Sequence, residues 1–211
     1  MEYETEEQQV EALKAWWAEN GRAVIAGVVL GVVVIGGWSF WQKRQATRAV
    51  AASDAYSLTM EAVAAGDGAR VTELADALAD DHDGTLYAAY ASLAAARVAV
   101  DEGDLEAAAK RLAWAVEHAP QDDVKLVAQL RLARVENANG QLDDALGRLP
   151  DTYPEEFTGL IEEARGDLLV ASGDTDGARA AYERARDSGN VADPNALGMK
   201  LDDLAVAGSS S

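Results

Sequence analysis

The 211-residue sequence contains no cysteine, only four prolines and only two histidines. Without cysteine, the chain has no disulfide, no catalytic thiolate and no cysteine-ligated zinc site. His82 and His118 lie far apart and lack the spacing of a metal-binding pair. The sequence shows no phosphate-binding loop and no nucleophile elbow, and no spacing singles out two carboxylates as an acid–base pair. We therefore predict that the protein is not an enzyme and needs no cofactor or metal.

Basic residues are also few, because 18 lysines and arginines face 37 acidic residues and leave a net charge of −19. Residues 1–22 contain six glutamates, one lysine and one arginine, so this segment has a net charge of −4 and residues 42–211 carry the remaining −15. Nucleic acids bind to footprints of lysine and arginine. We expect no nucleic-acid partner for a body of this charge.

One long hydrophobic run stands out, AVIAGVVLGVVVIGGWSFW at residues 23–41, which has no charged residue. At about 1.5 Å per residue, a helix of this length covers roughly 28 Å, close to the hydrocarbon thickness of a bilayer. The run is apolar on all sides, unlike most core helices, and it follows an acidic segment, unlike a signal peptide. We predict an acidic tail at 1–22 and a lipid-embedded transmembrane helix at 23–41. A cleaved signal peptide and a buried core helix are the alternatives.

Small residues at a spacing of four line one side of this span, at Ala23, Gly27 and Gly31. Without large side chains in the way, a second membrane helix can approach closely and gain dispersion contacts. We predict a packing face for another membrane helix here. The alternative is the general glycine richness of membrane helices.

The charges that flank the span give only a weak indication of its orientation. Lys14 and Arg22 precede it, and Lys43, Arg44 and Arg48 follow it. Because cytoplasmic flanks are richer in basic residues, the count of two against three slightly favours a cytoplasmic body.

Beyond the span, apolar residues recur at spacings of three and four, and no stretch alternates at a spacing of two. Short clusters of glycine, aspartate and proline divide this part into segments. We expect helices at 45–65, 69–80, 85–102, 105–118, 122–139, 142–149, 155–172, 175–187 and 195–206.

The expected helices form pairs with a repeat of about 35 residues. Gly103, Gly140 and Gly173 open similar segments at spacings of 37 and 33 residues, and Gly66 lies another 37 residues upstream. Helix pairs at this period are the tetratricopeptide pattern. We predict an all-α protein with one N-terminal transmembrane helix and a tetratricopeptide-like solenoid at 42–206, followed by a flexible tail at 207–211. The solenoid would have about four helix pairs and a C-terminal capping helix, and a non-repeating helical bundle is the alternative.

Each pair needs small residues where its two helices cross. Ala108, Ala145 and Ala178 lie five residues after the turn glycines, and Ala96, Ala133 and Gly166 lie seven residues before them. Leu112, Leu149 and Tyr182 take the large position between the helices. The first pair departs from the pattern with Thr59 and Val71, as terminal repeats usually do.

Stacked helix pairs present a concave face built from the first helix of each pair, which serves as a protein-binding surface. The residues predicted to face this groove are Tyr56, Met60, Tyr90, Leu93, Arg97, Val127, Leu130 and Arg134. Arg97 and Arg134 occupy equivalent repeat positions, so two guanidinium groups could grip a carboxylate or an extended peptide. The alternative is that each only pairs with a nearby acid such as Asp101 or Glu136.

Several segments together resemble the YfgM-type family of bacterial inner-membrane proteins, the ancillary subunits of the SecYEG translocon. These are ETEEQQVEALKAWWAENGR before the span, WSFWQ at its end, and LRLARVENANGQLDDAL and ARGDLLVASGDTDGARAAYERA in the repeats. The resemblance implies a membrane-anchored adaptor in the cell inner membrane, with a cytoplasmic N-terminus and a periplasmic repeat domain. We prefer this orientation to the one that the flanking charges slightly favour.

The resemblance also implies particular partners. These are the SecYEG translocon, a membrane-anchored parvulin-type periplasmic chaperone, the client proteins passed between them, and a cytoplasmic stress-response regulator that contacts the tail. The expected role is to help pass newly translocated proteins to periplasmic chaperones. Two other functions are a periplasmic scaffold for envelope or cell-division machinery, and a catalytic accessory such as a proline isomerase.

Overall fold

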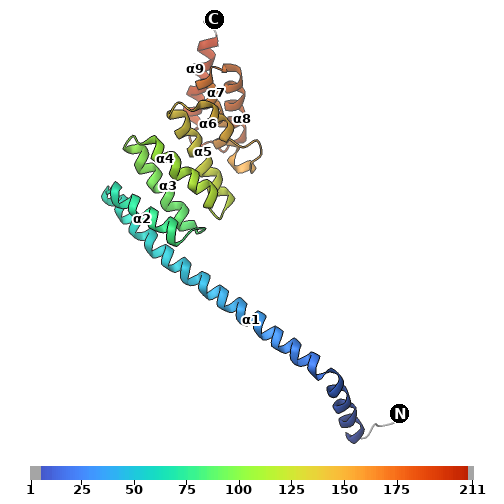
Figure 1. Ribbon diagram of the computed structural model, residues 1–211. Helices are drawn as coiled ribbons and strands as arrows, with labels where there is room; N and C mark the ends of the chain where they lie inside the picture. Colours follow the sequence, from blue (N-terminus) through green and yellow to red (C-terminus); the bar gives the residue numbers. More distant parts are fainter. Residues whose placement is uncertain (1–5, 209–211) are drawn as a thin grey trace. The chain divides into compact units, whose positions relative to one another are not determined.

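The computed structural model describes residues 6–208, and within this range every regular element is a helix. Figure 1 shows the elements in chain order, coloured from blue to red. Their bounds are α1 (Glu6–Ala65), α2 (Gly68–Asp81), α3 (Leu86–Asp101), α4 (Leu105–His118), α5 (Asp122–Ala138), α6 (Leu142–Arg148), the 3₁₀ helix η1 (Glu155–Phe157), α7 (Thr158–Ser172), α8 (Thr175–Ser188) and α9 (Pro194–Gly208).

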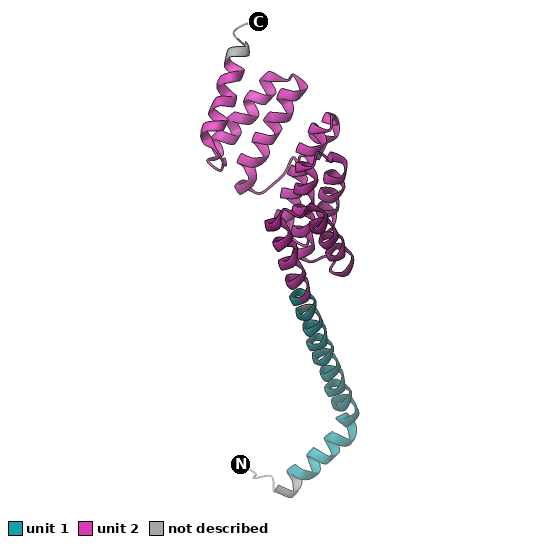
Figure 2. Ribbon diagram, turned by 90° about the vertical axis from the view of Figure 1, so that its left-hand side faces the viewer, with its two compact units in different colours: residues 1–50 teal, residues 51–211 magenta. Residues whose placement is uncertain are grey.

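The chain divides into two compact units, residues 1–50 and residues 51–211, shown in teal and magenta in Figure 2. We call them the N-terminal and the C-terminal unit. The division comes later than residue 42, where we predicted the repeat domain to begin, because α1 continues through both positions. The predicted flexible tail at 207–211 overlaps the end of α9, and residues 209–211 lie outside the described range.

The N-terminal unit contains the predicted span. Helix α1 is long and apolar enough to cross a membrane, and none of its most apolar window is buried inside the described protein. The large side chains of the span, such as Leu30, Ile35 and Phe40, are exposed. A core helix would bury these side chains, so this alternative is wrong for the described chain.

In the C-terminal unit the predicted helix boundaries agree with the structure to within about two residues for most segments. The largest differences are at two helix starts: α1 begins at Glu6 rather than 45, and α7 begins at Thr158 after η1 rather than at 155. Consecutive helices pack as antiparallel pairs, which confirms the tetratricopeptide-like arrangement and excludes the non-repeating bundle.

The turn has the same local structure in three of the pairs, α1–α2, α3–α4 and α7–α8. Gly66, Gly103 and Gly173 adopt positive φ values of 70°, 81° and 84°, a left-handed conformation that ends a helix without the steric cost a side chain would add. The next residue is an aspartate whose side chain caps the following helix. Asp104 Oδ1, for example, accepts a hydrogen bond from the backbone N–H of Ala107 at 2.9 Å. Such a cap contributes about 1 kcal/mol, so the Gly-Asp dipeptide both ends one helix and starts the next.

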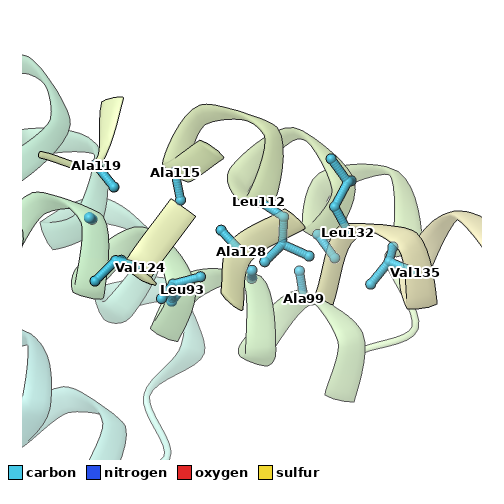
Figure 3. Packing of buried hydrophobic residues seen from close by; sticks show 12 residues of the cluster. Leu93, Ala99, Leu112, Ala115, Ala119, Val124, Ala128, Leu132 and Val135 are labelled. Atoms are coloured by element: carbon cyan, nitrogen blue, oxygen red, sulfur yellow. The ribbon is translucent and has the colours of Figure 1, made fainter. Parts of the chain in front are cut away.

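Small side chains let the paired helices approach. Ala108, Ala145 and Ala178 are fully buried, and the large residues Leu112, Leu149 and Tyr182 are also buried, as the repeat pattern predicts. Figure 3 shows part of this core, where side chains of α3, α4 and α5 interlock between the helix axes. The alanine-rich composition therefore reflects close helix packing rather than a lack of core.

Gly166 shows how strict this requirement is. A methyl group added to its Cα would collide with the ring of Tyr182, which is buried at the crossing of α7 and α8. The Tyr182 hydroxyl also donates a 2.8 Å hydrogen bond to Asp167, so the ring is held from its far end. The third small position is a glycine because its large partner is a tyrosine rather than a leucine.

We predict that Gly166→Ala lowers the free energy of unfolding by about 1–3 kcal/mol, because the added methyl group overpacks the crossing. Gly147→Ala in α6 is the matched control, since a methyl group there meets open space. The control should be neutral or stabilise by roughly 0.4–1 kcal/mol. Urea unfolding followed by circular dichroism measures both, and equal stability of the two variants would contradict the packing argument.

Candidate functional site

A cavity of about 470 Å³ opens on the concave side of the C-terminal unit. Its walls come from the first helices of three successive pairs, α1, α3 and α5, and from η1. We call it the aromatic cavity. It includes six of the eight predicted groove residues, namely Tyr56, Met60, Tyr90, Leu93, Arg97 and Val127.

Tyrosine rings cluster at one side of the aromatic cavity. The ring centroid of Tyr56 lies 5.8 Å from that of Tyr87 and 6.1 Å from that of Tyr90. Burial, with a smaller contribution from Tyr90, raises the pKa of Tyr56 above its ordinary value of 10.0. The phenol therefore stays neutral at physiological pH, so this side offers aromatic surface with a polar hydroxyl.

A second cavity of about 400 Å³ shares Leu93, Arg97 and Arg131 with the first, so the two adjoin, and we call them together the groove. Three arginines line the second cavity, Arg97, Arg131 and Arg134. We call it the arginine cavity. The groove therefore has an aromatic end and a cationic end.

The three arginines differ in their pairing. Arg97 Nε lies 2.9 Å from both carboxylate oxygens of Asp101, which raises the pKa of Arg97, so the internal pairing that we considered occurs here. Glu136 forms its ion pair with Arg148 rather than with Arg134. Arg148 Nη2 lies 2.8 Å from Glu136 Oε1. Within the described part of the chain, neither Arg131 nor Arg134 forms an ion pair.

The prediction that Leu130 faces the groove is wrong. Leu130 is only 6% exposed and packs with Ala133, Ala145 and other residues of the α5–α6–α7 core. Arg131 takes the groove position instead, because the face follows 127, 131 and 134 in α5 but 90, 93 and 97 in α3. Both spacings fit one helix face, so the sequence pattern alone does not separate them.

Phe157 is a wall of the aromatic cavity that the repeat pattern did not indicate. Helix α6 has 7 residues, whereas α2, α4 and α8 each have 14. The chain that would form the rest of α6 becomes the segment 149–157, which brings Phe157 to the concave side. Pro150 and Pro154 mark this loop in the sequence, but they do not indicate which way it turns.

A buried carboxylate anchors this loop from behind. Glu162 is 4% exposed and accepts a 2.7 Å hydrogen bond from the Tyr153 hydroxyl. Arg184 Nη2 lies 2.6 Å from the other carboxylate oxygen, and Arg165 donates both to Glu162 and to the backbone oxygen of Pro150. Because a buried carboxylate needs such partners, the network holds the loop against α7 and α8.

The other predicted face lies in the N-terminal unit. A methyl group added at Gly27 or Gly31 would meet nothing within 4 Å, and Ala23 is exposed. The ridge is therefore uncovered within the described chain, and its use as a packing face stays a prediction.

The histidines and acidic residues do not gather into a metal centre in the described range, where no group of three or more such residues could hold an ion. His118 stacks on Trp114 with ring centroids 4.5 Å apart, and its Nδ1 lies 2.9 Å from the Trp114 carbonyl oxygen. This agrees with the position of His118 at the C-terminal end of α4, where carbonyl groups lack helical partners.

Comparison with known proteins agrees with the fold and extends over the candidate span. The model of a tetratricopeptide repeat-like domain family matches residues 14–206. The chain is 37% identical to an ancillary SecYEG translocon subunit of Escherichia coli strain K12, over 97% of this chain and 98% of that protein. This chain belongs to the ancillary SecYEG translocon subunit family. Family members of the same name from Haemophilus influenzae and Aggregatibacter actinomycetemcomitans are 33% and 29% identical, each over 94% of this chain and 97% of the relative.

We predict that alkaline pH weakens the Tyr153–Glu162 hydrogen bond that holds the 149–157 loop. Burial and the hydrogen bond to Glu162 raise the pKa of Tyr153 from 10.0 to about 12. Because the folded pKa exceeds the unfolded one, this contribution to stability is complete below about pH 10 and is lost as the pH rises towards 12. Wild-type protein should lose stability more steeply across this range than Tyr153→Phe in urea unfolding.

Tyr182 remains in that variant, and burial together with the bond to Asp167 also raises its pKa, so the steepness should fall only in part. An unchanged pH dependence in Tyr153→Phe would contradict the role given to the Tyr153–Glu162 bond.

Proposed function

We propose that this chain is a membrane-anchored adaptor that associates with the SecYEG translocon through its span and contacts other proteins through its concave groove. The full-length similarity to ancillary SecYEG translocon subunits carries the proposal. It extends over the candidate span as well as the repeats, so both parts of the chain contribute to the likeness. An adaptor needs an anchor and a binding surface, and the chain has a helix and a groove suited to these tasks.

The proposal places residues 1–22 in the cytoplasm, 23–41 in the inner membrane and 42–206 in the periplasm. The repeats would then stand where translocated proteins emerge. They would help pass those proteins to a membrane-anchored chaperone of the parvulin type, while the tail contacts a cytoplasmic stress-response regulator. An exposed groove with apolar, aromatic and cationic walls suits transient contacts with other proteins better than chemistry on a small substrate.

The ridge formed by Ala23, Gly27 and Gly31 is the proposed contact with a membrane helix of the translocon. Large side chains on this ridge should separate the helices, because close backbone approach supplies most of the attraction between helices in lipid. The groove lies in the C-terminal unit and should affect other partners more than this contact.

The orientation is tested by fusing alkaline phosphatase after Ser211, because this enzyme is active only in the periplasm. We expect an active fusion. A matching β-galactosidase fusion, which works only in the cytoplasm, should be inactive. The opposite pair of results would overturn the proposed orientation.

The translocon contact is tested with Gly27→Leu/Gly31→Leu. We expect recovery of SecYEG with the full-length chain, after mild detergent extraction and affinity purification, to fall several-fold. Val29→Leu/Val33→Leu is the control, because it also places two leucines at the same spacing but on the opposite face of α1, where the side chains are already large. Wild-type recovery with the ridge variant would show that the ridge is not the contact.

A further inference from the structure

The groove reverses the charge of the unit that contains it. The C-terminal unit, residues 51–211, has a net charge of −18, yet Arg97, Arg131 and Arg134 line a single cavity of about 400 Å³. Only Arg97 has an acidic partner in the described chain, through Asp101. A guanidinium group binds carboxylates through paired hydrogen bonds, so Arg131 and Arg134 leave cationic donors available to an external acid.

The other end of the groove contains accessible apolar and aromatic side chains. Met60 is 42% exposed and Tyr90 is 37% exposed, although both are large hydrophobic residues on the inner side of a repeat domain. Phe157 adds a further aromatic wall from outside the repeat helices. Exposed apolar side chains gathered in one concavity indicate a surface that a partner covers.

The charges also orient the occupant. Asp123 lines the aromatic cavity but not the arginine cavity, whereas Arg134 lines only the arginine cavity. The arginine cavity thus has one more arginine and one fewer aspartate than the aromatic cavity, so a carboxylate is favoured at the arginine end. Since Leu93, Arg97 and Arg131 line both cavities, one short segment can reach both ends.

We propose that the groove binds a short extended peptide segment that carries an aromatic or large aliphatic side chain followed or preceded by acidic residues. The apolar side chain occupies the aromatic cavity between Tyr56, Tyr90 and Phe157, and the carboxylates contact Arg131 and Arg134. The inference rests on the proposed function, because it names the chemistry of the partner that the groove contacts. A long acidic partner would be repelled by the rest of the unit, so the recognised acidic stretch is short.

The probe is a fluorescent hexapeptide, Gly-Trp-Leu-Asp-Glu-Asp, mixed with the full-length chain in nanodiscs of neutral phosphatidylcholine. Fluorescence anisotropy should show saturable binding that weakens as salt is added, because the acidic contact is exposed to solvent. Two comparison peptides change one property each. Lysine replaces the three acidic residues in the first, and alanine replaces Trp and Leu in the second, and both should bind at least ten-fold more weakly.

Variants of the chain then locate the two contacts. Arg131→Gln/Arg134→Gln should weaken binding of the acidic peptide at least ten-fold and reduce the salt dependence of that binding. Phe157→Ala should mainly reduce the preference for the peptide with Trp and Leu. Arg70→Gln/Arg186→Gln is the matched control, because it removes the same charge from exposed arginines on α2 and α8 and should bind as wild type does.

The outcomes separate this inference from the proposed function. Equal binding of the lysine peptide, or full binding by Arg131→Gln/Arg134→Gln, would overturn the partner chemistry even if SecYEG still copurifies with the chain. If SecYEG does not copurify with the wild-type chain but the peptide binds as expected, the translocon role is overturned and the peptide site still stands. Absence of binding by all three peptides counts against a linear segment as the occupant.

Discussion

The close approach of paired helices at small side chains is the constraint on which the rest of the structure depends. Fully buried Ala108 and Ala178 allow the second helix of a pair to lie directly against the first. Leucine or tyrosine at the neighbouring large position then fills the crossing, and Gly166 is needed where that residue is Tyr182. Because the second, third and fourth pairs repeat this geometry, their first helices line up on one side of the C-terminal unit, and α1, α3 and α5 together line the groove.

The groove shows how differences between repeats give a repeat domain an individual surface. Equivalent positions in successive repeats place residues along the groove. The differences between repeats make one end of the groove aromatic and the other rich in arginine. Shortened α6 brings Phe157 to the aromatic end, and the Glu162 network holds the loop that carries it. The buried carboxylate of Glu162 is stable only with its hydroxyl and guanidinium partners. These polar residues do not follow the repeat pattern, and by holding the loop they position the apolar Phe157.

Charge works on two scales in this chain. The net charge of −19 sets a negative field at long range around the chain. At short range the arrangement of individual arginines matters more, because Arg97 and Arg148 have acidic partners whereas Arg131 and Arg134 have none in the described part of the chain. An acidic protein can thus offer a local cationic surface. Whether one of its arginines pairs internally or stays available to a partner depends on the acidic residues that lie next to it in the fold.

The sequence by itself determined the helical repeat, its turns, the small and large crossing positions and the apolar span, because each depends on local spacing along one helix or one turn. Seven of the eight residues that the same spacing predicted to face the groove line one of its two cavities. Only the tertiary structure decided between Leu130 and Arg131, since a helix face is set by what packs against it and both residues fit the periodicity. It also decided the place of Phe157 and the partner of Glu136, because a loop's direction and an ion pair between helices depend on groups distant in the sequence.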